Sequence, residues 1–154
     1  MAAQLFTLLG VVVGAVGSFL ATSAAERARY KRELATRWDE RRLQIYIQFS
    51  TCVKDIAANA ARSLQVSDDT KKAEFLEVME QRELERSGHF ETLMLLASAS
   101  AIDAAHEVNQ RIWDGLVATR NGEDPGDYGL VEALNALYSA ARRDLGVDGL
   151  PQSL

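Results

Sequence analysis

The chain has 154 residues and a net charge of −5, with 47% hydrophobic and 25% charged residues, which excludes a disordered or fibrous protein. At this length we expect one folded domain. Only two prolines occur, Pro125 and Pro151, so long uninterrupted helices are possible before residue 120. The single cysteine, Cys52, excludes an intrachain disulfide; it lies in an apolar stripe and is predicted to be a small core residue.

The charges are unevenly distributed along the chain. Residues 1–25 carry no charged side chain, whereas residues 26–42 hold seven basic and four acidic residues, a net charge of +3. The remainder must then carry −8, because the total is −5. Since phosphate contact requires an extended basic face, we expect no nucleic-acid partner.

The uncharged N-terminus has the length of a membrane-spanning helix. Roughly 20 helical residues cross a hydrocarbon core of about 30 Å, and residues 1–25 supply a predicted transmembrane anchor. The predicted span consists of Leu5, Phe6, Leu8, Leu9, Val11, Val12, Val13, Val16, Phe19 and Leu20. We therefore predict a single-pass protein of the cell membrane, with the lipid bilayer as a partner.

Basic residues that follow this segment predict its orientation. Positive charges favour the cytoplasmic side, which places the C-terminal domain in the cytoplasm. Arg27, Arg29, Lys31 and Arg32 form a predicted basic collar at the membrane surface.

Small residues recur every four positions in the same segment, at Gly10, Gly14, Ser18 and Thr22. Such a strip allows a second helix to approach closely, so it predicts a helix-packing surface for a homo-oligomer or another membrane protein. A Gly-rich helix without a partner remains an alternative. A signal peptide cleaved near Ala21–Ala24 is a second one, although the basic residues that precede such a peptide are missing.

The rest of the chain reads as all-α, with helices at about 26–64, 68–98, 101–120 and 129–145. The first carries an apolar stripe at helical spacing, comprising Tyr30, Leu34, Trp38, Ile45, Phe49, Cys52, Ile56, Ala60 and Leu64. Ser67-Asp68-Asp69 is predicted to supply the N-cap of the second helix, and Ser100, with Asp103 in a capping box, that of the third. We expect the anchor to continue into an antiparallel bundle of about four helices over residues 26–146, with a flexible tail at 147–154.

One stretch resembles a family of short single-pass membrane proteins of high-GC actinobacteria that have no assigned activity. The resemblance rests on Trp38-Asp39-Glu40-Arg41-Arg42-Leu43, then Tyr46, Phe49, Val53 and Lys54, within about the first 60 residues. It implies the same architecture and transfers no site.

Catalytic patterns are weak throughout the sequence. Asp103 and His106 share one helix face, but a carboxylate-bridged metal bundle needs such a pair on two helices. We therefore predict no enzyme, no metal site, no cofactor and no small-molecule substrate. Trp38 and Trp113 are interpreted as core or interface residues.

Together these patterns predict a membrane-anchored helical interaction or scaffold module. Two alternatives stay open: a membrane-perturbing protein of phage or stress origin, and a secreted helical protein released by cleavage.

Overall fold

The computed structural model describes the backbone of residues 2–147 and the side chains of Thr22, Ser23, Glu26, Arg27, Arg29, Tyr30, Glu33 and residues 36–147. Over that backbone it is all-helical, with four helices and no strand. The all-α prediction is therefore confirmed. The helices are α1 (Ala2–Gln65), α2 (Asp69–Leu96), α3 (Ala99–Arg120) and α4 (Leu130–Asp144).

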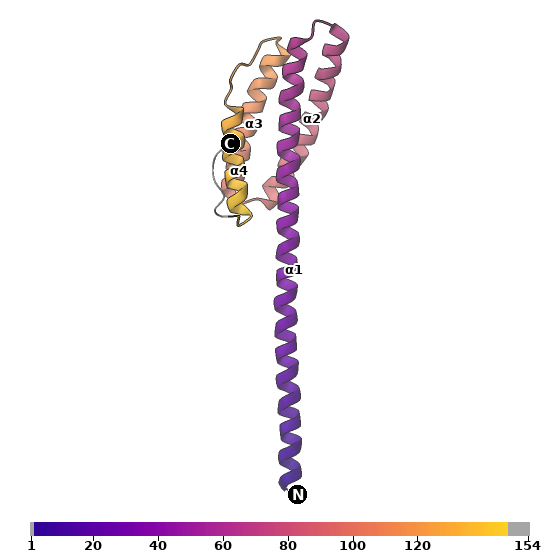
Figure 1. Cartoon of the computed structure of the whole chain (residues 1–154), viewed down its shortest axis with the longest axis vertical. Helices are drawn as coiled ribbons and strands as arrows, with labels where there is room; N and C mark the ends of the chain where they lie inside the picture. The colour runs from indigo at the N-terminus through magenta and orange to yellow at the C-terminus, as the bar shows by residue number, and fades with distance from the viewer. Residues whose placement is uncertain (1, 148–154) are drawn as a thin grey trace. The chain divides into compact units, whose positions relative to one another are not determined.

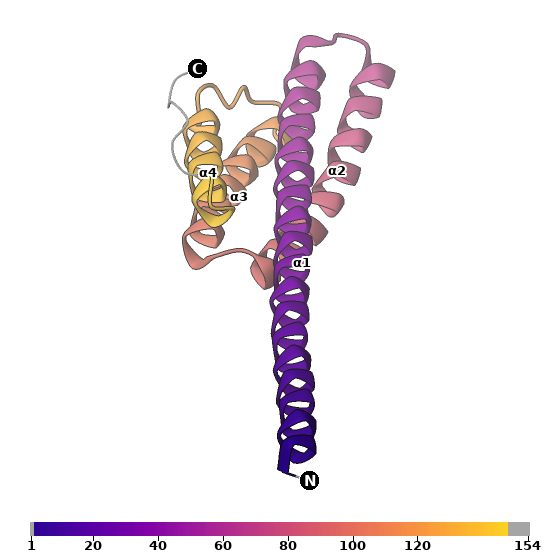
Figure 2. The ribbon, with the colours of Figure 1, turned by 60° about the horizontal axis from the view of Figure 1, so that its bottom comes forward.

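The chain divides into two compact units, Met1–Glu40 and Arg41–Leu154, and α1 contributes to both. The division falls at Arg41 and Arg42, where charges interrupt the apolar stripe of α1. In the second unit the four helices run alternately in opposite directions, as Figures 1 and 2 show.

Capping determines where two of these helices begin. The Asp68 side chain accepts hydrogen bonds from the backbone N–H groups of Thr70 and Lys71, at 2.9 and 3.2 Å, which starts α2. At α3 the cap position belongs to Ser98, which makes no side-chain cap bond, so the predicted cap at Ser100 is wrong. Helix α2 continues through Gly88 without a break.

One hydrophobic core joins all four helices of the second unit. Phe49 of α1 is fully buried, and its ring lies 6.1 Å from that of Phe90 on α2. Other fully or almost fully buried residues are Val53 and Ile56 from α1, Met79 and Leu93 from α2, Val108, Ile112 and Leu116 from α3, and Leu137 from α4. The Cys52 side chain is also buried, as predicted. The apolar stripe of α1 therefore provides one wall of the core.

Hydrogen bonds close one end of the four-helix unit. The Tyr46 hydroxyl donates to Asp144 at 2.6 Å, which joins α1 to the end of α4. Asp144 also accepts a hydrogen bond from the backbone N–H of Ser98, between α2 and α3. Arg42 donates to the Leu96 carbonyl at 2.8 Å, so the middle of α1 is connected here to the end of α2, the start of α3 and the end of α4.

The predicted location in the membrane needs correction. In the described part of the chain, no helix is both long and apolar enough to span a bilayer. The described residues of α1 before the four-helix unit include charged, exposed Glu26, Arg27, Arg29 and Glu33, and α2, α3 and α4 each carry charged residues along their length. A single-pass location in the cell membrane is therefore wrong on this finding. The side chains of the predicted span, Leu5 to Leu20, lie outside the described residues, as does the predicted tail from residue 148 onward.

We expect the α1 stripe to dominate the stability of the four-helix unit. Phe49→Ala removes a ring that is fully buried, so it should lower the free energy of unfolding by about 3–5 kcal/mol. Ile47→Ala, on the exposed face of the same helix, should change it by less than about 0.5 kcal/mol. Urea unfolding monitored by circular dichroism measures both values, and equal losses would contradict this account of the core.

We also expect an alkaline loss of stability at the Tyr46–Asp144 contact. Burial, helped by the hydrogen bond to Asp144, raises the pKa of the Tyr46 phenol above its usual value near 10. Above about pH 10 the unfolded chain releases this proton and the folded chain keeps it, so the free energy of unfolding falls by about 1.4 kcal/mol per pH unit.

Urea titrations between pH 9 and 11.5 test this prediction. Tyr46→Phe should give a shallower decline than the wild type, because the group that releases the proton is gone. Tyr30→Phe, which alters a side chain that is 64% exposed, should keep the wild-type slope. The interpretation fails if Tyr46→Phe declines as steeply as the wild type.

Candidate functional site

Two aromatic side chains lie exposed on α1 within residues 22–40. Tyr30 is 64% and Trp38 is 53% exposed, although the sequence places both on the apolar stripe. By sequence, Trp38 precedes Ile45 by seven residues, which is the spacing of the predicted apolar stripe. Residues of this predicted stripe are buried between Ile45 and Ala60 in the second unit, whereas Tyr30 and Trp38 are exposed in the first.

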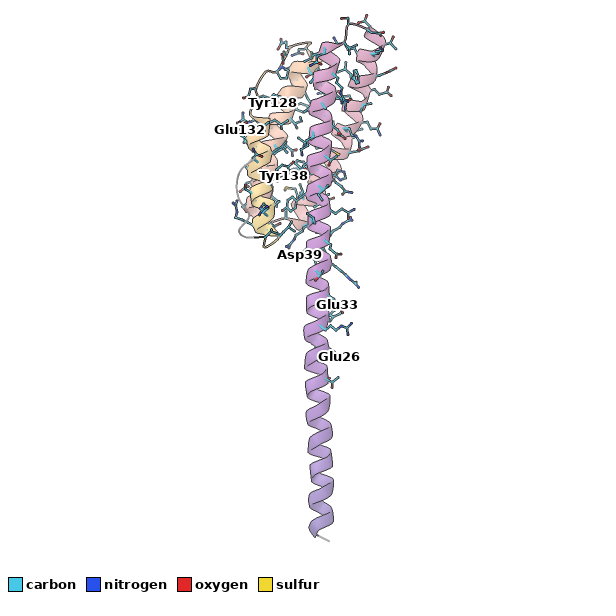
Figure 3. All side chains as sticks on the ribbon, viewed as in Figure 1. Glu26, Glu33, Asp39, Tyr128, Glu132 and Tyr138 are labelled. Carbon is cyan, nitrogen blue, oxygen red and sulfur yellow. The ribbon has the colours of Figure 1, made fainter. Side chains whose placement is uncertain are left out.

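Charged side chains accompany this uncovered part of the stripe. The Arg29 Nε donates to Glu33 at 2.8 Å along the helix, and both side chains are exposed. Figure 3 shows Glu26, Glu33 and Asp39 at intervals along the same stretch of α1. Exposed charges beside an apolar stripe are typical of helices that pair with another helix.

The other predicted site residues are only partly described. Thr22, the last residue of the small-residue strip, is exposed, as are Arg27 and Arg29 of the basic collar. The side chains of Gly10, Gly14, Ser18, Lys31 and Arg32 lie outside the described residues.

An open groove of about 580 Å³ lies between α3 and α4. It is lined by Glu107 and Arg111 from α3, by Asp127 and Tyr128 from the connecting loop, and by Glu132 and Ala136 from α4. Figure 3 labels Tyr128 and Glu132 on this part of the structure. Arg111 Nε donates to Glu107 at 2.8 Å, so the positive charge in the groove is already paired.

Tyr128 contributes to this groove and also to a partly open pocket between α1 and α3. Its ring lies against the backbone of Gly115, where an added Cβ would meet two ring atoms at 3.0 Å. Burial raises the pKa of the Tyr128 phenol. The ring of Tyr128 therefore packs closely on Gly115 and brings the loop between α3 and α4 against α3.

A buried arginine is the most unexpected polar residue of the unit. Arg86 of α2 is only 8% exposed; its Nε donates to Glu83 at 2.7 Å, and its Nη1 donates to Asn109 of α3. Sequence reasoning missed it because arginine is a charged residue that periodicity assigns to the surface. The seven-residue spacing of Met79, Arg86 and Leu93 is the signal that could have identified it.

The described residues hold no cluster of three or more metal-ligating side chains. His106 is exposed, and its ring lies edge-on to Phe90 at 4.8 Å between centroids. Burial, followed by the charge of Glu85, raises the pKa of the Cys52 thiol. This shift disfavours the thiolate, the form of cysteine that acts as a nucleophile.

Neither tryptophan belongs to the core, since Trp113 is 51% exposed and Trp38 is 53% exposed. Trp113 lies beneath the Arg120 guanidinium, 5.5 Å from the ring centroid, and Arg120 also binds Glu80 of α2. Its exposed face is therefore partly occupied by a neighbour from the same chain.

Comparison of the chain with family models, with curated proteins and with solved structures finds no match in any of the three. The functional assignment therefore depends on the geometry of the chain itself.

Proposed function

We propose that this protein is a helical interaction module that associates with a second copy of itself through α1. The observation that carries the proposal is the exposure of Tyr30 and Trp38, two aromatic residues whose sequence spacing assigns them to an apolar stripe. Large aromatic side chains are common anchors of protein interfaces, because they bury much area at a low cost in conformational entropy.

A second copy is the occupant that this stretch of helix favours. An apolar stripe flanked by charged residues is self-complementary when two identical helices meet, as in a coiled coil. By sequence, Leu34 fills the position between Tyr30 and Trp38. The stripe thus offers one large apolar side chain per helical turn to an identical partner.

Charge gives the proposed association a characteristic salt dependence. Residues 26–42 carry a net charge of +3 in each copy, so two such segments repel one another at low ionic strength. An apolar seam should therefore strengthen as salt is added, whereas a seam held by ion pairs should weaken.

Trp38→Lys should weaken self-association of the full chain at least tenfold, because an interface tryptophan typically contributes 2 kcal/mol or more. Sedimentation velocity over a range of protein concentrations and at 50 and 500 mM salt measures the dissociation constant. Trp113→Lys is the matched control, since that tryptophan is 51% exposed on α3 and should leave the constant unchanged.

Three results would contradict the proposal. The wild type could remain monomeric at all accessible concentrations, the two tryptophan variants could weaken association equally, or added salt could dissociate the oligomer. Far-UV circular dichroism of each variant checks that helix content is retained.

A further inference from the structure

Helix α2 is attached to the rest of the four-helix unit by few buried residues. All 28 of its residues are described, and three of them, Met79, Arg86 and Leu93, are buried at intervals of seven positions. By contrast, six of the 15 described residues of α4 are buried. Leu76 and Phe90 of α2 pack against the core only in part. Since most of the stability of a helix in a protein comes from the packing of its apolar face, α2 is held less firmly than α4.

One of the three buried residues of α2 carries a charge. The Arg86 guanidinium is paired with Glu83 of its own helix, and its Nη1 donates to Asn109 of α3. A buried pair of this kind contributes little net stability, because the hydration that both charges lose offsets their attraction. In this fully described helix, the two apolar residues that are completely buried are therefore Met79 and Leu93.

The ion pairs that connect α2 to its neighbours lie at the protein surface. Arg82 binds Asp55 of α1 at 3.3 Å and also Glu85 of its own helix. Arg120 of α3 binds Glu80 of α2. Each of these side chains is more than a third exposed, with the exception of Arg120, which is 35% exposed. Ion pairs that water can reach contribute little, so they add little to the two buried apolar residues.

The two ends of α2 are held differently. At the C-terminal end, Arg42 of α1 donates to the Leu96 carbonyl, and the Ser98 N–H that follows the helix donates to Asp144 of α4. Residues 69–78, all of them described, include no buried side chain. Detachment of α2 is therefore expected to begin at its N-terminal end and to proceed toward Met79.

We propose that α2 is a detachable cover, which unfolds locally while α1, α3 and α4 remain packed. Proteins open in such units at a lower free energy than global unfolding, and units with few buried apolar contacts open first. The opening exposes the face of α1 that α2 covers. This face includes Cys52, whose Sγ lies 4.0 Å from the Glu85 carboxylate, and Phe49, whose ring lies beside that of Phe90. Access to these two side chains of α1 is therefore controlled by α2.

The remaining helices keep a core of their own when α2 detaches. In both Figure 1 and Figure 2, α2 and α4 lie on opposite sides of α1. Val53 of α1, Ile112 of α3 and Leu137 of α4 are almost fully buried, and none of them belongs to α2. The packing of α4 should therefore be the same whether α2 is attached or not.

The single cysteine provides a direct test of the opening. Cys52 is 3% exposed, so iodoacetamide, a neutral thiol reagent, can reach it only after α2 has moved. Labelling of the full chain is followed by mass spectrometry, and its rate divided by that of the urea-unfolded chain gives the opening constant. We expect this constant to be at least tenfold larger than that of global unfolding measured by circular dichroism. It should also depend less on urea, because local opening exposes less surface.

Two matched variants separate local from global opening. Met79→Val removes part of a fully buried side chain of α2, so it should speed Cys52 labelling about threefold or more. Leu137→Val makes a change of similar size at a buried position of α4 and should leave the labelling rate unchanged. Both substitutions are small, so global unfolding does not become the faster route to the thiol.

Amide hydrogen exchange gives a second readout that does not depend on the thiol. Peptides from α2 should exchange faster than peptides from α3 and α4, and residues 69–78 should exchange fastest within α2. A movement limited to the Cys52 side chain would not produce this pattern.

Three results overturn the proposal. These are an opening constant equal to that of global unfolding, equal acceleration of labelling by Met79→Val and Leu137→Val, or exchange in α2 that is as slow as in α3 and α4. Neither variant alters Trp38, so the detachable cover is tested separately from self-association.

Discussion

Helices α2, α3 and α4 pack together with α1 in residues 41–147 because α1 presents one apolar face between Ile45 and Ala60. Phe49 reaches Phe90 of α2 from this face, while Ile56 and Ala60 face α3 across the partly open pocket. Burying a large apolar side chain contributes about 1.5–3 kcal/mol, so each such residue of the stripe adds to the stability of the unit. Helix α2 buries only Met79, Arg86 and Leu93 along its 28 residues. It therefore has few core contacts of its own and depends strongly on the apolar face of α1.

Polar contacts then select one arrangement of these helices. An apolar stripe tolerates small rotations and shifts, but a buried charge must keep its partners. Arg86 meets this requirement through Glu83 on its own helix and Asn109 on α3, which restricts how α2 can rotate against α3. At one end of the unit, Asp144 accepts hydrogen bonds from both Tyr46 and Ser98. The core supplies most of the stability, and these contacts restrict its geometry.

Residue size varies along α1, and the proposed self-association follows from the large residues at one part of it. At Tyr30 and Trp38 the stripe carries large aromatic residues that are exposed, and an identical helix could cover them. At Ala57, Ala60 and Ala61 the same helix carries small residues, and a partly open pocket lies beside α3. Helix α1 thus carries large exposed aromatic residues in one unit and small residues beside a partly open pocket in the other.

The sequence by itself determined which residues are helical, because periodicity, capping residues and the absence of proline act over a few residues at a time. Asp68 capped its helix as its chemistry predicts, and the stripe from Ile45 to Ala60 identified the α1 face of the core. Only the tertiary structure decided which faces meet. In the tertiary structure Arg86 is buried, Trp38 and Trp113 are exposed, and the Tyr128 ring lies against Gly115. Local sequence patterns do not predict these outcomes, because each depends on which other parts of the chain lie nearby. The predicted membrane location was overturned for the described residues, where charged and apolar side chains share every helix. Local patterns fix a helix, whereas burial depends on the surface that each side chain meets.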